Sequence, residues 1–177
     1  MATGVDIVEL DAAQALAAAG QLGEVLADCV AGGASVNFMH PFSQADGQAF
    51  FLGVADDVAR GAAVLLAAKL DGRIVGTVQL GLDTPPNQPH RADVKKMLVH
   101  RIARRRGVGA ALLGALEQAA RDHGRTLLVL DTVTGDDGDR LYVRLGWNRV
   151  GEIPDYAMFP DGRMCGSTYF WKRTPGA

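Results

Sequence analysis

Residues 98–110 constrain the fold of this chain more than any other stretch of its sequence. A predicted strand ends there, four arginines fall within residues 101–106, and two glycines flank one valine where a helix is predicted to begin. Glycine lets a ligand approach the main chain because it has no Cβ. The first helical turn leaves amide N–H groups without internal partners and carries partial positive charge. The stretch therefore predicts a phosphate site at a helix start, the alternative being a solvated basic loop before an ordinary helix.

Four helices are predicted. The first two each begin with a capping-box pair, Asp11 with Gln14 and Ser43 with Asp46, and end at glycines near residues 32 and 61. Apolar residues at helical spacing predict a third helix from Val108 that ends before residue 124. A short fourth helix is predicted over residues 140–145.

Six strands complete the predicted fold. The dipeptide Asp71-Gly72 is typical of a type I′ turn between two of them. The continuous apolar run 127–130 predicts a strand buried on both faces. The order ααβββαβαββ predicts an α/β fold with a mixed sheet flanked by helices, and an extra short N-terminal strand is left open. The predicted strands cover residues 64–70, 73–82, 92–99, 127–130, 147–153 and 167–171.

Length, charge and apolar runs narrow the class of protein. At 177 residues the chain has the size of one domain, spanning 1–177. Its net charge of −2 argues against a nucleic-acid binder held by bulk charge. The longest apolar run, 62–68, is far shorter than the roughly 20 residues of a membrane-spanning helix. No basic segment opens the chain, so we expect a cytoplasmic protein without nucleic-acid or membrane partners.

The metal-ligating residue types are scattered. Cys29 and Cys165 lack metal-ligand spacing and are predicted to be reduced thiols. The four histidines include no pair at metal-ligand spacing, so no metal is expected.

The glycine pattern does not match two common phosphate-binding motifs. A Walker loop needs lysine and a hydroxyl residue after the glycines, but Ala110 and Ala111 follow Gly109. A dinucleotide fingerprint is the second-ranked interpretation, because Asp131 lies at a suitable distance downstream. It is weakened because seven residues separate the strand from the first glycine and because Leu112 stands where the third glycine belongs.

Arg104-x-x-Gly107-x-Gly109 resembles the acyl-CoA pyrophosphate loop of the GNAT N-acetyltransferases. Leu141-Tyr142 followed by Leu145-Gly146-Trp147 is similar to that family's Leu-Tyr-x-x-x-Gly-aromatic signature. Three further segments are similar to the tabtoxin-resistance branch, which acetylates a small toxin amine. They are Gly-Gly-Ala-Ser-Val-x-Phe-Met at 32–39, Leu-Asp-Thr at 130–132 and Arg-Val-Gly-Glu at 149–152.

The resemblance covers most of the chain and implies a GNAT-like fold with acetyl-CoA as co-substrate. It implies that a main-chain N–H near Leu98 or Val99 stabilises the oxyanion, and that the splayed strand there pairs with the pantetheine arm. The residues expected to bind the cofactor are Met97, Leu98, Val99, Arg104, Arg105, Arg106, Gly107, Val108, Gly109 and Ala110.

Two glycines depart from the wider family pattern. Gly135 stands where many members carry a cofactor-contacting asparagine, and Gly138 stands where a helix-forming alanine is usual. The helix that carries Tyr142 is therefore expected to begin late.

Two aspartates are candidates for the amine site. The nitrogen attacks the thioester directly, through a tetrahedral intermediate, only after the ammonium loses its proton, which a carboxylate can accept. Asp93 lies in the strand before the phosphate loop, and Asp131 is expected to end the 127–130 strand. The resemblance implies acids at both positions, and the sequence leaves open which one is the base. In the alternative, Asp93 pairs with Lys95 or Lys96 and Asp131 caps a loop.

Tyr142 is the candidate acid for the departing thiolate, because a phenol can donate a proton without carrying charge. The spacing alone favours a core tyrosine instead, and the Leu-Tyr-x-x-x-Gly-Trp context favours the acid.

The acceptor is expected to be a small, amino-acid-like or antibiotic- or toxin-like primary amine. Its site is expected between Asp131 and the loop that carries Asn37 and Phe38, closed by residues 156–161. Two other classes remain open, a non-catalytic acyl-CoA sensor and a module that binds RNA or an anionic surface. The sequence also leaves open a homodimer, the identity of the amine and an acyl group other than acetyl.

Overall fold

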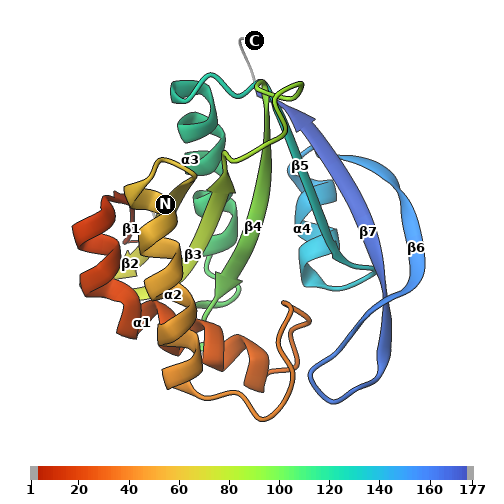
Figure 1. Cartoon of the computed structure of the whole chain (residues 1–177). Helices are drawn as coiled ribbons and strands as arrows, with labels where there is room; N and C mark the ends of the chain where they lie inside the picture. Colours follow the sequence, from red (N-terminus) through yellow and green to blue (C-terminus); the bar gives the residue numbers. More distant parts are fainter. Residues whose placement is uncertain (1–3, 175–177) are drawn as a thin grey trace.

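The computed structural model describes residues 4–174, which form one mixed sheet with helices on both faces (Figure 1). The strands are β1 (Val5–Leu10), β2 (Ala63–Leu70), β3 (Arg73–Gly81), β4 (Arg91–Val99), β5 (Leu127–Val133), β6 (Asn148–Met158) and β7 (Met164–Arg173). The helices are α1 (Ala12–Ala31), α2 (Gln44–Ala59), α3 (Val108–Asp122) and α4 (Asp137–Arg144), with a 3-10 turn η1 at Arg101–Ala103.

The sheet has the order β1-β2-β3-β4-β5-β7-β6. Every neighbouring pair is antiparallel except β4 and β5, which run parallel. The predicted α/β fold with a mixed sheet is confirmed, and β1 is the extra N-terminal strand that the sequence left open.

Local signals explain where the first elements begin. Asp11 and Ser43 cap α1 and α2, and each forms a reciprocal capping box with the residue three positions later. Asp71 and Gly72 both have positive φ, 50° and 79°, as a type I′ turn between β2 and β3 requires. These predictions are confirmed.

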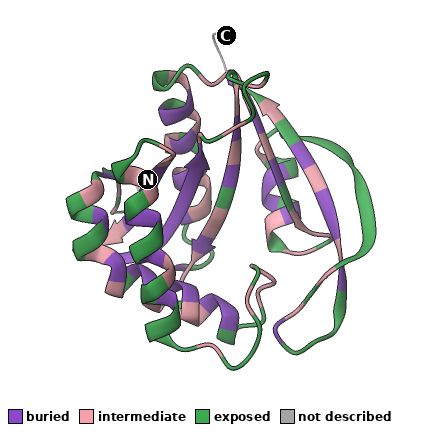
Figure 2. Ribbon diagram, in the orientation of Figure 1, coloured by how far each residue is buried: buried purple, intermediate pink, exposed green. Residues whose placement is uncertain are grey.

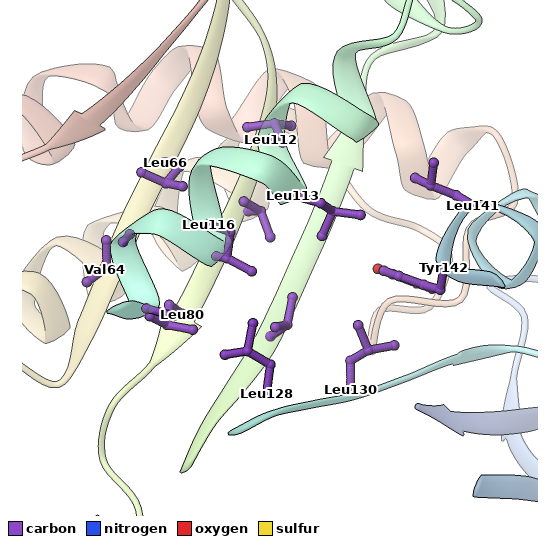
Figure 3. Packing of buried hydrophobic residues seen from close by; sticks show 14 of the residues in the cluster. Val64, Leu66, Leu80, Leu112, Leu113, Leu116, Leu128, Leu130, Leu141 and Tyr142 are labelled. Carbon is purple, nitrogen blue, oxygen red and sulfur yellow. The ribbon is translucent and has the colours of Figure 1, made fainter. Parts of the chain in front are cut away.

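Two hydrophobic cores lie on opposite faces of the sheet (Figure 2). On one face, α1 and α2 bury Leu22, Leu26 and Phe51 against β1–β4. On the other face, leucines of α3 pack with Leu128, Leu130 and residues of α4 (Figure 3). Among residues 4–174, no helix packs over β5, β6 and β7 on the α1/α2 face, and this part is called the open face of the sheet below (Figure 1).

Glycines set the distance between α1 and α2. A Cβ on Gly23 would lie 2.8 Å from the Cα of Gln48, and a Cβ on Gly47 would lie 2.5 Å from the carbonyl oxygen of Gly23. The two backbones therefore touch at a point where neither helix tolerates a side chain.

Three expectations about the C-terminal half were wrong. The helix carrying Tyr142 begins at Asp137, capped by Asp136, and not near residue 140. Gly138 fits there because Thr132 Oγ1 lies 2.8 Å from where its Cβ would be. β5 continues to Val133, so Asp131 lies within the strand, and only Leu128 and Leu130 are buried because no helix covers the other face.

The last two strands are longer than predicted. β6 continues through Pro154 to Met158, with a register shift between residues 153 and 157. Proline lacks the N–H that an inner strand needs, but it is tolerated in an irregular edge strand. The sequence pattern could not reveal that β6 is the edge.

Candidate active site

The N-terminus of α3 presents backbone N–H groups without a side-chain cap. Gly107 is the N-cap residue, with φ of 80°, and no side chain in the described range 4–174 caps this helix start with a hydrogen bond. Its positive φ is the left-handed region that glycine adopts without strain. Val108, the first helical residue, is buried and fixes the helix against the sheet. Val108, Gly109 and Ala110 thus present amides and the positive end of the helix dipole.

The three arginines before this helix have different surroundings. Arg104 donates from Nε to the carbonyl oxygen of Val99 at 3.2 Å, so it braces the end of β4. Arg105 is largely exposed and forms a loose ion pair with Asp137 at 3.3 Å. Arg106 is exposed. The arginine-rich loop therefore combines one structural cation with two that face solvent.

Gly109 is also a packing position. A Cβ there would lie 3.0 Å from Leu141 Cδ2 and 3.6 Å from Met97 Cε. The missing side chain lets α3 approach α4 and β4 closely, beside the residue that precedes Tyr142.

β4 and β5 separate in the middle of the sheet. Among the described residues, their parallel pairing spans three register pairs and ends at Asp93 with Val129. Leu98 and Val99 still pair with β3, at Thr77 and Gly76. Within residues 4–174, the side of β4 that faces β5 has no paired strand over Met97, Leu98 and Val99, the segment where the family resemblance implies a splayed strand.

Tyr142 lies on α4 with its side chain in the core. Figure 3 shows the ring pointing from α4 toward Leu113 of α3 and Leu130 of β5. Within residues 4–174 its hydroxyl has no hydrogen-bond partner, and burial, with the charges of Asp136 and Asp131, raises its pKa. The phenol is therefore a proton donor at neutral pH. The ring is thus a core residue, as the spacing alone predicted, and the acid role of its hydroxyl stays a prediction.

The two candidate acids, Asp93 and Asp131, lie on the same face of the sheet. It is the face that α1 and α2 cover only over β1–β4. Asp93 is opposite Val129 in register, and Asp131 follows two residues later, so the two positions are about 6.6 Å apart along the strands. Asp93 forms an ion pair with Arg91, and not with Lys95 or Lys96 as the alternative supposed. Asp131 is exposed and accepts a hydrogen bond from Ser167 Oγ at 2.6 Å. The side chains differ in that only Asp93 has a cationic partner among the described residues.

The loop between α1 and α2 lies against the β6–β7 hairpin. Ser35 Oγ donates to the carbonyl oxygen of Met158 at 2.6 Å, and the His40 N–H donates to that of Pro160 at 3.1 Å. These contacts join the two segments that the sequence placed around the amine. Asn37 is exposed with φ of 78°, and Phe38 is half-buried.

Phe38 belongs to an aromatic group that also holds a lysine. Its ring centroid lies 4.6 Å from that of Phe42 and 5.4 Å from that of Phe50 on α2. The ammonium of Lys96 lies 5.7 Å from the centroids of both Phe38 and Phe50. Desolvation by burial and the charge of Lys95 lower the pKa of Lys96, while the charge of Asp131 opposes this shift.

Sequence reasoning missed Lys96 and a tyrosine pair as site residues. Lys96 lies at a bulge, with φ of 50°, where the register between β3 and β4 shifts. Two successive lysines within a buried strand break its alternation, which is a signal of such a bulge. Tyr169 lies opposite Asp131 on β7, and its hydrogen bond to Tyr156 at 2.6 Å, with smaller effects from burial and Asp131, raises its pKa to about 12. No local sequence signal identifies that pair.

Residues 4–174 show neither a metal cluster nor a membrane-spanning helix. Within that range, no three His, Cys, Asp or Glu side chains are grouped to share a metal ion. None of the helices described is long and apolar enough to cross a membrane.

Comparison with known proteins places this geometry in a family. The sequence model of the Acetyltransferase (GNAT) family matches residues 29–147. Aminoglycoside N(6')-acetyltransferase type 1 of Klebsiella aerogenes is 33% identical over 100 residues, or 54% of this chain and 66% of that protein. The matched part is thus just under two thirds of that relative's length.

Solved structures share the fold along nearly the whole chain. Ribosomal-protein-alanine N-acetyltransferase from Brucella melitensis has a TM-score of 0.79 at 19% identity, covering 95% of this chain and 99% of that one. The putative acetyltransferase yncA from Salmonella typhimurium, solved with its cofactor acetyl-CoA, has a TM-score of 0.79 at 17% identity, covering 98% and 95%. Since the family match spans more than half of the sequence, the chain belongs to the acetyltransferase (GNAT) family, enzymes that transfer an acetyl group from acetyl-CoA.

Proposed function

We propose that this enzyme transfers the acetyl group of acetyl-CoA to a primary amine of a small molecule. The observation that carries the proposal is the hydroxyl of Tyr142, which has no hydrogen-bond partner among residues 4–174 and belongs to a buried side chain close to Leu130, just beyond the last register pair of β4 and β5. A thiolate that leaves there needs a proton, and a phenol with a raised pKa holds one at neutral pH. A tyrosine that only filled the core would be expected to place its hydroxyl against an acceptor.

The residues around α3 fit the cofactor. The uncapped amides of Val108, Gly109 and Ala110 suit a pyrophosphate, and Arg105 and Arg106 add positive charge nearby. We propose that Arg104 contributes by fixing the end of β4, and that the unpaired side of Met97, Leu98 and Val99 pairs with the pantetheine arm. A main-chain N–H of Leu98 or Val99 then lies beside the thioester as the oxyanion donor.

The amine is proposed to lie on the open face of the sheet beside Asp131. An exposed carboxylate held only by Ser167 can attract an ammonium and accept its proton. Asp93 is the other candidate base, although its ion pair with Arg91 competes with the amine. Asn37 and Phe38 are proposed to contact the acceptor from the loop side.

Two observations support a small acceptor over a protein tail. The loop 32–42 is hydrogen-bonded to the β6–β7 hairpin, so the two segments that are proposed to flank the amine are joined. The relative from Klebsiella aerogenes is named for an aminoglycoside as its acceptor, which is a small amine. Besides these two observations, the three segments that resemble the tabtoxin-resistance branch favour the same class of acceptor, so we propose a role in toxin or antibiotic resistance.

We propose that residues 1–177 form a single domain that acts in the cytoplasm, alone or as a homodimer. It predicts release of free thiol when the protein is mixed with acetyl-CoA and a panel of amines, amino acids, aminoglycosides and histone-like peptides. Thiol release with small amines supports the proposal. Binding of acetyl-CoA without thiol release from any acceptor would identify a non-catalytic sensor, and turnover with peptides alone would contradict the small-acceptor proposal.

A further inference from the structure

Lys96 is held in an unusual position on the open face of the sheet. The bulge in β4 gives this residue a left-handed backbone, with φ of 50°, which is strained for a residue with a Cβ. Neighbouring Lys95 has an ordinary conformation, is exposed and extends past Gly81. The bulge thus turns one of two adjacent lysines toward Phe38 and Phe50.

The ammonium of Lys96 has charge nearby but no direct partner. Within residues 4–174 it forms no ion pair and no hydrogen bond, although burial lowers its pKa. Aromatic faces attract a cation but do not accept its three protons as an anion would. Asp131 is close enough to affect this pKa, but its own hydrogen bond is to Ser167. The Asp131 carboxylate and the Lys96 ammonium therefore lie near each other without forming an ion pair.

We propose that Lys96 is a specificity-determining residue that binds an anionic group, a carboxylate, on the acceptor amine. The inference rests on the proposed function and names its substrate class: amines that also carry a carboxylate. The acceptor's ammonium lies at Asp131, and its carboxylate lies at the ammonium of Lys96, which the rings of Phe38 and Phe50 hold in place. A polycationic acceptor is disfavoured, because its charges would face Lys96 without hydrogen-bond acceptors.

The test compares acceptors that differ only by a carboxylate, such as L-lysine with cadaverine and L-phenylalanine with phenethylamine. The variants are Lys96→Met, Lys96→Arg and the exposed neighbour Lys95→Met as the matched control. Methionine and arginine keep a Cβ at φ of 50°, so the backbone strain is unchanged. For each acceptor amine, kcat/KM is measured, and its binding affinity is measured by calorimetry in the presence of CoA.

We expect the parent enzyme to prefer the carboxylate-bearing member of each pair. Lys96→Met should lower kcat/KM for that member by about 10- to 100-fold, the range for a charged hydrogen bond, and leave the decarboxylated amine unchanged or improved. Lys96→Arg should restore most of the preference, and Lys95→Met should not change it. If Lys96 had only a structural role, Lys96→Met would lower kcat/KM equally for both members of each pair.

The outcomes separate this inference from the proposed function. If the parent acetylates amines but the carboxylate preference is absent or survives Lys96→Met, the role of Lys96 is wrong and the proposed function stands. If no amine is acetylated yet carboxylate-dependent binding disappears in Lys96→Met, the proposed function is wrong and the anion site stands. Absence of both turnover and carboxylate-dependent binding overturns both.

Discussion

Alanine at Gly23 should destabilise the protein although alanine favours helices. A Cβ there would lie 2.8 Å from the Cα of Gln48, whereas ordinary contacts begin at 3.4 Å, so α1 and α2 must separate by at least 0.6 Å. The obstacle is backbone, which cannot rotate away as a side chain can. Overpacking of this kind costs about 1–3 kcal/mol, and a backbone obstacle belongs near the upper end. The helix propensity gained from alanine offsets about 1 kcal/mol of it.

The expected net loss for Gly23→Ala is therefore about 2 kcal/mol, or a fall in Tm of about 4–8 °C for a domain of this size. Gly20→Ala in α1 and Gly53→Ala in α2 are matched controls, because a Cβ at either position meets nothing within 4 Å. They should gain about 1 kcal/mol from helix propensity. Thermal and urea unfolding of the three variants measure the difference.

The same substitution should reach the amine site. α2 carries Phe50, whose ring lies 5.4 Å from that of Phe38, so separation of the helices disturbs this aromatic group. The N-terminal end of α3, which we propose binds the pyrophosphate, belongs to the helix on the other face of the sheet. We expect Gly23→Ala to raise the KM for the amine and leave the KM for acetyl-CoA nearly unchanged. A Gly23→Ala protein as stable as Gly20→Ala would refute the reasoning from backbone contact.

Three further predictions concern the proposed chemistry. Tyr142→Phe should lower turnover by about 10²–10⁴-fold without changing acetyl-CoA affinity, and the parent rate should not fall through loss of the Tyr142 proton between pH 7 and 10, because burial raises that pKa; unchanged turnover would return Tyr142 to a purely structural role. Gly107→Ala should weaken acetyl-CoA binding and cost about 1–2 kcal/mol of stability, because φ is 80° there, while Gly107→Asn should keep more of both in calorimetry and thermal unfolding. Asp131→Asn should impair amine kinetics more than Asp93→Asn, since Arg91 already engages Asp93; parent rates in both variants would exclude a carboxylate base.

The sequence predicted those parts of the fold that depend on neighbouring residues. Capping boxes at Asp11 and Ser43, the turn at Asp71-Gly72 and the glycine-rich start of α3 are local features, and each lies where the sequence indicated. The predicted start of α4 was wrong because glycine is a weak helix former, yet Gly138 lies in the first turn of α4. Its reason lies in Thr132, a residue of β5 that approaches it in space.

The candidate site was predictable only in part for the same reason. The motif around Gly107 and the context of Tyr142 are contiguous in sequence, whereas the surroundings of Asp131 come from several strands. The position of Lys96 depends on the bulge between β3 and β4 and on the packing of α2, which local sequence patterns do not specify. Ion pairing of Asp93 with Arg91 also depends on which face of β4 is open.

The short pairing of β4 with β5 has a consequence for how the molecule opens. The boundary between β4 and β5, called the seam here, divides the sheet into β1–β4 on one side and β5–β7 on the other. Only three register pairs among the described residues join the two sides, so little backbone hydrogen bonding opposes their separation. Side-chain packing of Leu113, Leu130 and Tyr142 bridges the seam on one face. Units joined in this way exchange amide hydrogens through partial opening, below the free energy of global unfolding. The amide hydrogens of β5 and β7 should therefore be less protected against exchange than those of β2 and β3. A ligand bound across the seam should raise the protection of β5 and β7 selectively.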